Sequence, residues 1–494
     1  MKTRPSPLAA ENTATEFTHV PVVREVLADF DTPLSAYAKL CDERSGGYLL
    51  ESVQGGERWG RYSIIGLPAR REIRFRDGIW REYFDGEQVL ERRCSEPLAA
   101  IREFMAEYRV PPVTELPRFS GGLVGYFGAD LVRYLEPRLA AGRKPGNVDD
   151  MRLLLAEELV VFDNLRGSAF LVAHARTGDP AATVVAKRRL DEMHASLQRP
   201  LRTASARQVH AGEFVSSFGE KPFKASVARI REYIRDGDAM QVVLSQRMDA
   251  DFDGDALDVY RALRLLNPSP YLYFLNFGDV QIAGSSPEAL VRVEGDEVTV
   301  RPIAGTRPRG VTIEEDQQLE RELHADPKER AEHLMLIDLG RNDVGRISAI
   351  GSVRVTEQMA TERYSHVMHL VSNVTGKLRD GCDALDALAA GFPAGTLSGA
   401  PKLRALEIID ELEPEARGIY SGAVGYLGWQ GSLDTAIAIR TAVIRNGTLQ
   451  VQAGAGIVCD SDPAREWEET LNKSRALLEA VKMVANGMQL DEGE

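Results

Sequence analysis

The sequence predicts an α+β fold, a two-lobed α/β sandwich in which helices cover large antiparallel sheets. The chain has 494 residues, which is long enough for two or three lobes with substantial cores. Its strand-like and helical stretches alternate irregularly, without the strict strand–helix–strand repeat that is typical of a parallel sheet. One string also occurs twice, as GLVGYFG at 122–128 and GAVGYLG at 422–428, with five of seven positions identical. We interpret it as a duplicated sheet element through which two lobes face each other, chance similarity of two glycine-rich strands being the alternative.

The first half of the chain is expected to hold a flexible arm at residues 1–17 and an N-terminal lobe at 18–197. Short apolar runs broken by glycines and charges predict strands at 48–53, 62–66, 72–76 and 119–128. A longer apolar stretch at 153–175 predicts two more strands, joined by a turn at 164–167. Helical spacing of apolar residues predicts helices at 33–44, 97–108 and 180–197.

A polar, weakly periodic stretch at 198–222 is interpreted as a linker. It leads to a catalytic lobe at 223–487, which is followed by a short tail at 488–494. The same patterns predict helices at 223–236, 255–266, 328–340, 382–391, 400–411 and 463–485. Strands are predicted before residue 303 and at 240–252, 353–359, 422–429, 435–444 and 449–458.

The composition is that of an ordinary soluble protein, with 27% charged and 44% apolar residues. A net charge of −14 makes nucleic acid or an anionic membrane an unfavourable first hypothesis for the partner. We expect no membrane association, because no apolar run approaches the length of a membrane span and the first residues lack the apolar core of a signal peptide. Four cysteines without metal-type spacing indicate free thiols in a reducing compartment, so a cytoplasmic location is expected.

Two segments share one design, a helix start followed by a pair of acids. Each begins with Asp-Pro, at 326–327 and at 462–463, which is typical of an N-cap and the first helical residue. The acids that follow lie three residues apart on one helix face: Glu329 with Glu332, and Glu466 with Glu469. The two pairs could converge on one hard cation, which takes oxygen ligands. The alternative is that the helix dipole favours acids at any helix start.

Several short, unusual strings in the second half carry further polar residues. They are SSPEAL with Glu288, RPIAGTRPRG with Gly305 and Thr306, YSHVMHLVS with His369, and FPAGTLSGAPK with Thr396, followed by Tyr420 and Arg440. Each has a plain alternative, such as a solvated arginine loop or a structural histidine. None matches the GxxxxGK[ST] phosphate loop or the Gly-x-Ser-x-Gly nucleophile elbow. Together with the acids they predict a site for a small polyanion, built from a metal, arginines, backbone donors and acid/base groups.

A family resemblance rests on five strings in a fixed order: SSPEAL, RPIAGTRPRG, ERAEHLMLIDLGRND, FPAGTLSGAPK and GAGIVCDSDPAREWEET. They closely resemble the motifs of the chorismate-utilising enzymes. The resemblance covers residues 220–485 strongly and the N-terminal lobe more loosely. It implies the fold of that family, chorismate as the substrate and Mg²⁺ as the cofactor.

The resemblance implies that the four helix-start acids form the magnesium site. Glu332 and Glu469 would ligate the ion directly, while Glu329 and Glu466 would hold its waters. Mg²⁺ would anchor the carboxylate on the substrate ring and withdraw charge as the leaving group departs. Glu288 matches the family's general acid, which must hold a proton near pH 7 and therefore needs a raised pKa.

The resemblance also implies a binding site for the rest of the substrate. Tyr420 and Arg440 would hold the pyruvyl carboxylate, with arginine as the bidentate partner. His369 would lie beside the reacting ring and assist the second step, so that Glu288, His369 and Thr396 are the expected catalytic residues. The other expected substrate contacts are Gly305, Thr306, Thr396, Gly454, Gly456 and Lys473.

Two positions distinguish members of this family by their nucleophile. Members that add water carry a lysine base in the string that reads QVVLS here, and Gln241 cannot deprotonate water, whereas ammonia is already nucleophilic. Members with a nucleophilic lysine carry it in PIKGT, where this chain has Ala304. The remaining reaction is amination of chorismate by ammonia, followed by elimination of pyruvate to give anthranilate, the first step of tryptophan biosynthesis. The family takes the ammonia from a separate glutamine amidotransferase subunit, which we expect here as a partner in a heterotetramer.

A second pair of strings resembles the family's feedback site for tryptophan: LLES at 49–52 and NPSPYLYF at 267–274. The alternative is a plain strand end and a proline-rich turn. Tryptophan bound between lobes would act by favouring one lobe arrangement over another. The residues expected to contact it are Leu50, Glu51, Ser52, Arg61, Asn267, Pro268, Pro270, Tyr271, Leu272 and Tyr273.

Three other functions compete with this one. A metal-dependent phosphoryl-transfer enzyme would also use paired carboxylates and arginines, but the chain has no phosphate loop. A catalytically inactive tryptophan sensor is disfavoured by the intact acids, with Glu288 and His369. An aminating synthase that stops at the 2-amino intermediate is the nearest alternative. Such relatives are usually fused to their glutaminase and need no tryptophan site, so a separate chain with LLES favours anthranilate.

Overall fold

The computed structural model describes residues 16–41, 45–52, 61–113, 116–142, 144, 146–201, 209–364 and 367–489. Most of the predicted arm, part of the predicted linker and most of the predicted tail lie outside these ranges. The last residues of the predicted helix at 33–44 and of the predicted strand at 48–53 lie outside them as well. The proposed division into two lobes therefore stays a prediction.

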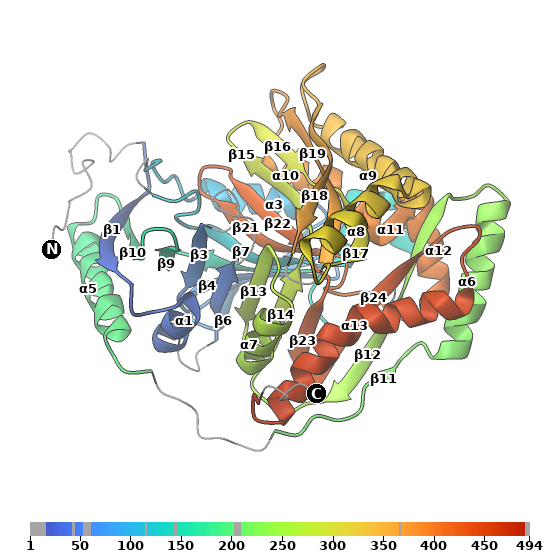
Figure 1. The fold of residues 1–494 in the computed structure, drawn as a ribbon. Coiled ribbons are helices and arrows are strands. Elements are labelled where there is room, and N and C mark those ends of the chain that lie inside the picture. The colour runs from blue at the N-terminus through green and yellow to red at the C-terminus, as the bar shows by residue number, and fades with distance from the viewer. Residues whose placement is uncertain are drawn as a thin grey trace.

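Two antiparallel sheets of 12 strands each form the centre of the fold (Figure 1). Sheet A runs in the order β1 (His19–Leu27), β10 (Ser168–Arg176), β9 (Glu158–Asp163), β3 (Tyr62–Gly66), β2 (Gly47–Glu51), β13 (Tyr271–Asn276), β14 (Gln281–Ser286), β23 (Thr441–Arg445), β24 (Thr448–Ile457), β12 (Gln241–Asp251) and β11 (Val215–Ser216), with β20 (Gly399–Ala400) beside β12. Sheet B runs in the order β17 (Ile303–Pro308), β19 (Val367–Lys377), β16 (Glu297–Val300), β15 (Ala289–Glu294), β22 (Leu433–Ile437), β21 (Ala423–Gly428), β7 (Gly122–Phe127), β8 (Met151–Ala156), β4 (Arg71–Arg76), β5 (Ile79–Phe84) and β6 (Glu87–Arg93), with β18 (Arg354–Arg363) beside β19. Both halves of the chain contribute strands to both sheets.

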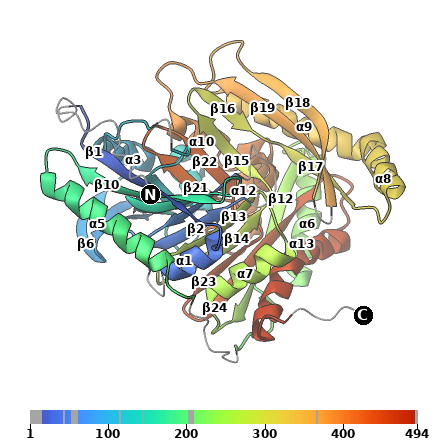
Figure 2. The same ribbon diagram turned by 60° about the vertical axis from the view of Figure 1, so that its left-hand side comes forward.

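Helices cover the outer faces of the two sheets (Figures 1 and 2). Sheet A is covered by α1 (Pro33–Cys41), α5 (Pro180–Leu197), α7 (Ala256–Leu266) and α13 (Pro463–Ala485). Sheet B is covered by α3 (Pro97–Ala106), α9 (Pro327–Gly345) and α10 (Ala384–Gly391). The remaining helices are α4 (Val132–Leu135), α6 (Glu220–Arg235), α8 (Ile313–Ala325), α11 (Gly395–Ser398) and α12 (Lys402–Leu412). In the part of the chain that the structure describes, no helix is long and apolar enough to cross a membrane.

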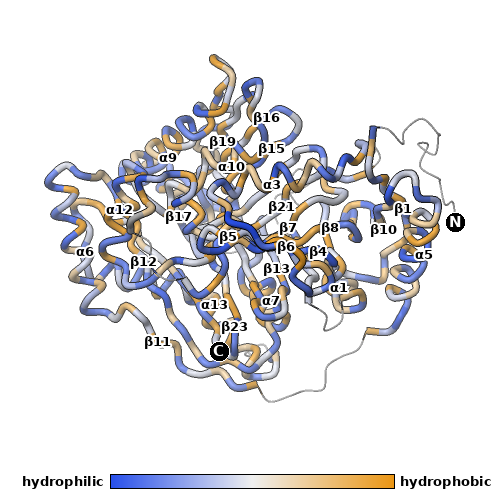
Figure 3. Tube along the Cα trace, turned by 180° about the vertical axis from the view of Figure 1, so that it is seen from behind, coloured by the Kyte–Doolittle hydropathy of each residue, from blue (hydrophilic) through white to orange (hydrophobic). Residues whose placement is uncertain are grey.

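The core between the sheets follows from the two-residue period of the strands. Inward-facing residues such as Tyr126, Leu154, Val172 and Ile282 are buried together between the sheets. Every residue of β6 is exposed, and along the β5–β6 edge of sheet B the hydrophilic tube is interrupted by short hydrophobic segments (Figure 3). The predicted α+β sandwich of antiparallel sheets is confirmed.

The repeated glycine-rich strings are neighbouring strands. β7 and β21 pair antiparallel, with Gly125 opposite Gly425. A Cβ on Gly425 would collide with the carbonyl oxygen of Asp434, and one on Gly125 with the carbonyl oxygen of Arg152. The repeat therefore joins the two halves of the chain at the middle of sheet B, where only glycine allows the backbones to approach this closely.

Two predicted strands are wrong in their extent. The predicted strand at 435–444 is two strands, β22 of sheet B and β23 of sheet A, because the backbone turns between the sheets at residues 438–440. The stretch at 153–175 contains the end of β8 in addition to the predicted hairpin of β9 and β10. Both errors have one cause, since a strand buried on both faces and a strand that changes sheet have the same continuous apolar pattern.

Helix α8 was not predicted, because its exposed surface hides the apolar period that identifies a helix. Only Asp316 and Leu323 are buried in it. Its start could have been identified from the Thr-x-x-Glu pattern at 312–315, which is typical of a helix cap. In the structure, the Thr312 hydroxyl accepts from the Glu315 N–H at 3.2 Å. The four cysteines are free, as their spacing predicts.

We expect Gly425→Ala to destabilise the protein, because the added methyl group meets a backbone carbonyl that cannot move without breaking sheet B. Overpacking of this kind costs about 1–3 kcal/mol, which should lower the midpoint of thermal unfolding measured by circular dichroism. Gly345→Ala is the control, because a Cβ at that position meets nothing within 4 Å. Equal midpoints for the two variants would contradict the proposed role of the repeat.

Candidate active site

Glu288 and Arg440 lie where the chain crosses from one sheet to the other. Glu288 connects β14 of sheet A to β15 of sheet B, and Arg440 lies between β22 of sheet B and β23 of sheet A. The crossings are bonded to each other. The Ile437 N–H donates to the Glu288 carbonyl at 3.0 Å, and the Ser285 N–H donates to the Arg440 carbonyl at 3.1 Å. Arg440 itself has φ 48°, a left-handed conformation that turns the chain out of β22.

A cavity of about 330 Å³ lies beside these crossings, and most of the predicted site residues line it. They are Glu288, Thr306, Glu332, His369, Thr396, Tyr420, Arg440, Gly454, Gly456, Glu466, Glu469 and Lys473. Gln241 and Ala304, which distinguish members of the family, line it as well. The predicted residues Gly305 and Glu329 are not in the wall. They lie behind it, where the Gly305 carbonyl accepts from His369 and Glu329 pairs with Arg307.

Burial raises the pKa of Glu288 to about 7. The hydroxyl of Thr396 donates to Glu288 Oε1 at 3.0 Å and acts in the opposite direction, as do the charges of Arg440 and Lys473. Desolvation is the larger effect, because it disfavours the carboxylate more than these groups favour it. Glu288 can therefore hold a proton near neutral pH, as a general acid must.

The ring of His369 is held in one tautomer. Its Nδ1 lies 2.9 Å from the Gly305 carbonyl, and since a carbonyl only accepts, Nδ1 carries the proton. Burial lowers the pKa of His369, so the ring is neutral at pH 7 and Nε2 is a free acceptor. The ring of Tyr364 packs edge-on against it at 5.4 Å.

Three acids from the starts of two different helices line the same cavity. Glu332 belongs to α9, whereas Glu466 and Glu469 belong to α13. Burial raises the pKa of Glu332, and the negative charges of Glu329 and Glu469 raise it further. Burial raises the pKa of Glu466 as well, with a contribution from Glu469. The carboxylates therefore repel one another across the cavity, a repulsion that a divalent cation would relieve.

Among the described residues, no three His, Cys, Asp or Glu side chains are close enough together to form a ready metal site. Cations of the protein hold two of the acids: Glu469 pairs with Lys473 at 2.8 Å, and Glu329 pairs with Arg307 at 3.3 Å. The donor set nevertheless fits Mg²⁺, which prefers carboxylate oxygens and keeps several waters. Three of the acids, Glu332, Glu466 and Glu469, line the cavity and would supply those oxygens, while Glu329 lies behind its wall.

Another part of the cavity wall combines the positive charge of Arg440 with a stretch of β24 that side chains approach closely. Among the described residues, no carboxylate forms an ion pair with the Arg440 guanidinium, and burial lowers its pKa. A Cβ on Gly454 would lie 2.9 Å from the hydroxyl of Tyr420, and one on Gly456 would meet the amide of Gln241. An anion can therefore reach the β24 backbone and a guanidinium that lacks a counter-ion.

Sequence reasoning missed several residues of the cavity wall. Gln452 precedes Gly454 by two residues on the same face of β24, so strand alternation could have identified it. Lys328 follows the proline that begins α9, one position before the first predicted acid. Apolar wall residues such as Val243 and Leu397 carried no signal, because nothing distinguishes them from core residues.

A second cavity, of about 340 Å³, contains most of the residues predicted for tryptophan. The pairing of β2 with β13 brings the two strings together, with Leu50 opposite Tyr273 and Glu51 opposite Leu272. The predicted residues in its wall are Leu50, Glu51, Ser52, Arg61, Pro270, Tyr271, Leu272 and Tyr273.

Asn267 and Pro268 do not line this second cavity. Asn267 is the C-cap of α7, and its side-chain amide donates to Ser285 Oγ at 3.3 Å. Sequence reasoning missed Arg118, Phe119, Arg292, Tyr426 and Asp434 in this wall. Part of this wall is formed by the repeated string at 422–428. In the sequence, that string predicted a sheet element but no ligand site.

Comparison with known proteins assigns the chain to a family. A family model described as chorismate binding enzyme matches residues 58–479. Component 1 of anthranilate synthase from Pseudomonas aeruginosa is 56% identical over 481 residues, which covers 96% of this chain and 97% of that protein. The crystal structure of anthranilate synthase component I from Streptococcus pneumoniae is 38% identical, with a TM-score of 0.75, and the match covers 92% of this chain and 98% of that one.

A menaquinone-specific isochorismate synthase from Escherichia coli has the same fold, with 20% identity and a TM-score of 0.70. The match covers 94% of this chain and 96% of that one. The family model and the two anthranilate synthase relatives agree over nearly the full chain. The chain therefore belongs to the chorismate-binding enzymes, in the branch of anthranilate synthase component 1.

Proposed function

We propose that this chain is the magnesium-dependent, tryptophan-inhibited large subunit of an anthranilate synthase. It aminates chorismate with ammonia from a glutamine amidotransferase subunit and then eliminates pyruvate. One observation carries the proposal: Glu288, with a pKa of about 7, lies in one cavity with Arg440 and the acids of two helices. The same cavity holds Gln241 and Ala304 at the two positions where a lysine would give another reaction.

The amination needs a proton donor on one side of the ring and a nucleophile on the other. The lone pair of ammonia forms a bond to the ring carbon beside the carboxylate, and the ring double bonds shift. The C–O bond to the ring hydroxyl then breaks, and Glu288 gives its proton to the departing oxygen, which leaves as water. The new ammonium group loses a proton to become the amine. Thr396 holds Glu288 in place through its hydroxyl, which donates at 3.0 Å.

The elimination makes the ring aromatic. Neutral His369, with its proton on Nδ1, offers Nε2 as the base that takes the proton from the carbon bearing nitrogen. The electrons of that C–H bond enter the ring, the bond from the ring to the enolpyruvyl oxygen breaks, and pyruvate leaves after taking up a proton. An enzyme without this second step would release the 2-amino intermediate instead.

The substrate is held by its two carboxylates. Arg440 and Tyr420 bind the pyruvyl carboxylate, because a buried guanidinium without a counter-ion gains most from an anion. Gly454 and Gly456 let the ring carboxylate approach the β24 backbone, and Lys473, whose ammonium donates to the Gly454 carbonyl at 3.0 Å, adds positive charge. Thr306 completes this part of the wall, and Gly305 fixes the ring of His369.

The magnesium site is expected at the contact with the ring carboxylate of the substrate. Glu332 and Glu469 would hold the ion directly, and Glu329 and Glu466 would hold it through water. The bound ion would neutralise the ring carboxylate and withdraw electron density from the ring.

The second cavity suits a zwitterionic amino acid with a large apolar side chain. It offers the carboxylate of Asp434, the guanidinium groups of Arg118 and Arg292, and apolar walls such as Phe119 and Pro270. The Tyr273 hydroxyl lies 2.6 Å from Thr441 Oγ1, beside Arg440. Tryptophan that binds better to one arrangement of these strands would therefore change the position of Arg440.

We expect activity to fall as the pH rises above about 7, because burial raises the pKa of Glu288 to about 7 and the general acid is lost when it ionises. Glu288→Gln should lower kcat by about 10²–10⁴. Thr396→Val removes a hydrogen bond that favours the carboxylate, so the alkaline limb of kcat/KM should move to higher pH. A limb that stays in place would contradict the assignment of this limb to Glu288.

Anthranilate should form from chorismate, Mg²⁺ and ammonium chloride, and chelation of Mg²⁺ should abolish its fluorescence. Glu469→Gln should raise the Mg²⁺ concentration for half-maximal rate by about 100-fold, since even outer partners of a metal contribute 10–100-fold. Glu468→Gln, an exposed neighbour on α13, is the matched control. Chorismate consumed without fluorescence would instead indicate the 2-amino intermediate, and no consumption would refute the proposed function.

Ser52→Phe should fill the second cavity and abolish inhibition by tryptophan while leaving the uninhibited rate within about twofold, since Ser52 is outside the first cavity. The measurement is anthranilate formation with increasing tryptophan. Ser217→Phe makes the same change at an exposed position and should stay inhibited. Unchanged inhibition of Ser52→Phe would refute the tryptophan site.

A further inference from the structure

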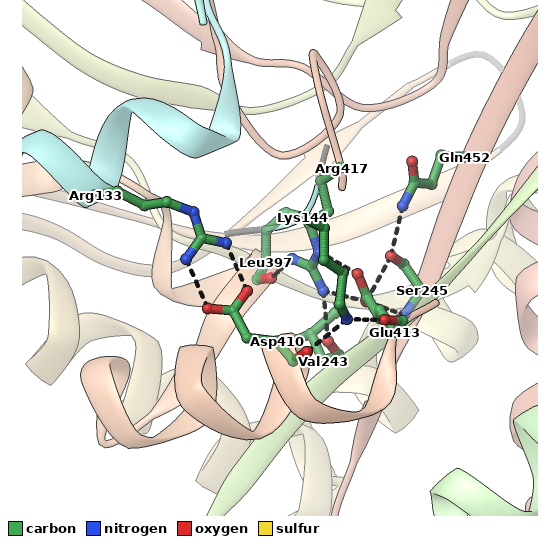
Figure 4. Close-up of polar contacts among 9 residues, drawn as sticks. All are labelled: Arg133, Lys144, Val243, Ser245, Leu397, Asp410, Glu413, Arg417 and Gln452. Carbon is green, nitrogen blue, oxygen red and sulfur yellow. Dashed lines mark hydrogen bonds and ion pairs between the residues drawn. The ribbon is translucent and has the colours of Figure 1, made fainter. Parts of the chain in front are cut away.

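A buried polar network lies behind the wall of the active-site cavity and is centred on Glu413, which is 4% exposed (Figure 4). Its carboxylate accepts from the N–H and the hydroxyl of Ser245, at 2.8 and 2.7 Å. Arg417 donates to it from Nε at 2.9 Å and from Nη2 at 2.6 Å. With four donors around it, the carboxylate acts as an acceptor only.

The network fixes the cavity wall from behind. Arg417 also donates to the carbonyls of Leu397 and Val243, at 2.6 and 2.8 Å, and both of these residues line the cavity. The end of α12 is held in turn by Lys144, which donates to the carbonyls of Asp410 and Glu413. These hydrogen bonds leave the groups attached to the network little freedom to turn.

Gln452 is attached to this network in only one orientation. Its Nε2 lies 2.8 Å from Ser245 Oγ. The single proton of the Ser245 hydroxyl is donated to Glu413, so Ser245 Oγ can only accept from Gln452. The amide of Gln452 must therefore present its NH₂ group to Ser245, which leaves its carbonyl oxygen directed away from the network (Figure 4). In the described part of the chain, no group donates a hydrogen bond to that oxygen.

Gln452 occupies the boundary between two cavities. It lines the active-site cavity together with Tyr420, and the same two residues line a small adjoining cavity of about 30 Å³. That volume holds one molecule the size of water or ammonia, and it excludes chorismate. On β24, Gln452 is two residues from Gly454 on the same strand face. Gln452 therefore shares a cavity wall with Gly454, the proposed contact of the ring carboxylate, and with Tyr420, the proposed contact of the pyruvyl carboxylate.

We propose that Gln452 binds the ammonia nucleophile, with its side-chain carbonyl accepting an N–H from it. This assignment rests on the proposed function. Ammonia held in this way keeps its lone pair free for the ring carbon, while chorismate keeps its own contacts to Arg440 and Tyr420. Ser245, Glu413 and Arg417 are positioning residues, because they act on ammonia only by fixing the amide of Gln452.

The test is steady-state kinetics of anthranilate formation with ammonium chloride, with both substrates varied at fixed pH. Gln452→Met keeps the length of the side chain and removes the acceptor. It should raise the KM for ammonium at least tenfold and leave the KM for chorismate within twofold. Ser245→Ala frees the amide to rotate, so it should raise the KM for ammonium by a smaller factor, again without a change for chorismate.

Gln450→Met is the matched control, since Gln450 lies on the same face of β24 but does not line the active-site cavity, and its side-chain oxygen already accepts from Asn147 Nδ2 at 3.2 Å. Both of its KM values should stay within twofold of the original. An unchanged KM for ammonium in Gln452→Met, or an equal rise in the KM for chorismate, would overturn the proposal. If Gln452→Met does not fold, Ser245→Ala decides by the same difference between the two KM values. Failure of the unsubstituted chain to make anthranilate would refute the proposed function instead.

Discussion

The site depends on the pair of backbone hydrogen bonds that join the two crossings between the sheets. Through them the loop with Glu288 and the loop with Arg440 are bonded to each other, at 3.0 and 3.1 Å. Each loop leaves one sheet and enters the other, so neither can shift without moving strands of both. The backbones of Glu288 and Arg440 are thereby fixed relative to β24, which is the neighbour of β23 in sheet A.

The ionisable side chains of the cavity are poorly solvated when no ligand is bound. Burial raises the pKa of Glu288, Glu332 and Glu466, and it lowers the pKa of Arg440. Each shift means that the charged form is poorly solvated there. A dianionic substrate with a divalent cation would supply the missing counter-charges, so the free energy gained on binding includes relief of these desolvated charges.

The two large cavities have no wall residue in common, but neighbouring segments of the chain connect them. β22 carries Asp434 in the wall of the second cavity and leads directly to the crossing with Arg440. Tyr273 lines the second cavity, and its hydroxyl is hydrogen-bonded to Thr441, the residue after Arg440. A ligand that moves β13 or β22 would therefore act on Arg440 through only one or two residues.

The α+β class, most helices and the polar residues that line the first cavity can be predicted from the sequence alone. Caps such as Asp326 and Asp462, and the apolar periods of the strands, act over a few residues and can therefore be identified locally. Three features became visible only in the folded chain. Residues 435–444 divide between two sheets, Gly305 and Glu329 lie behind the cavity wall, and Glu413 orients the amide of Gln452 through Ser245. Those outcomes depend on contacts between residues tens to hundreds of positions apart, which no local pattern encodes.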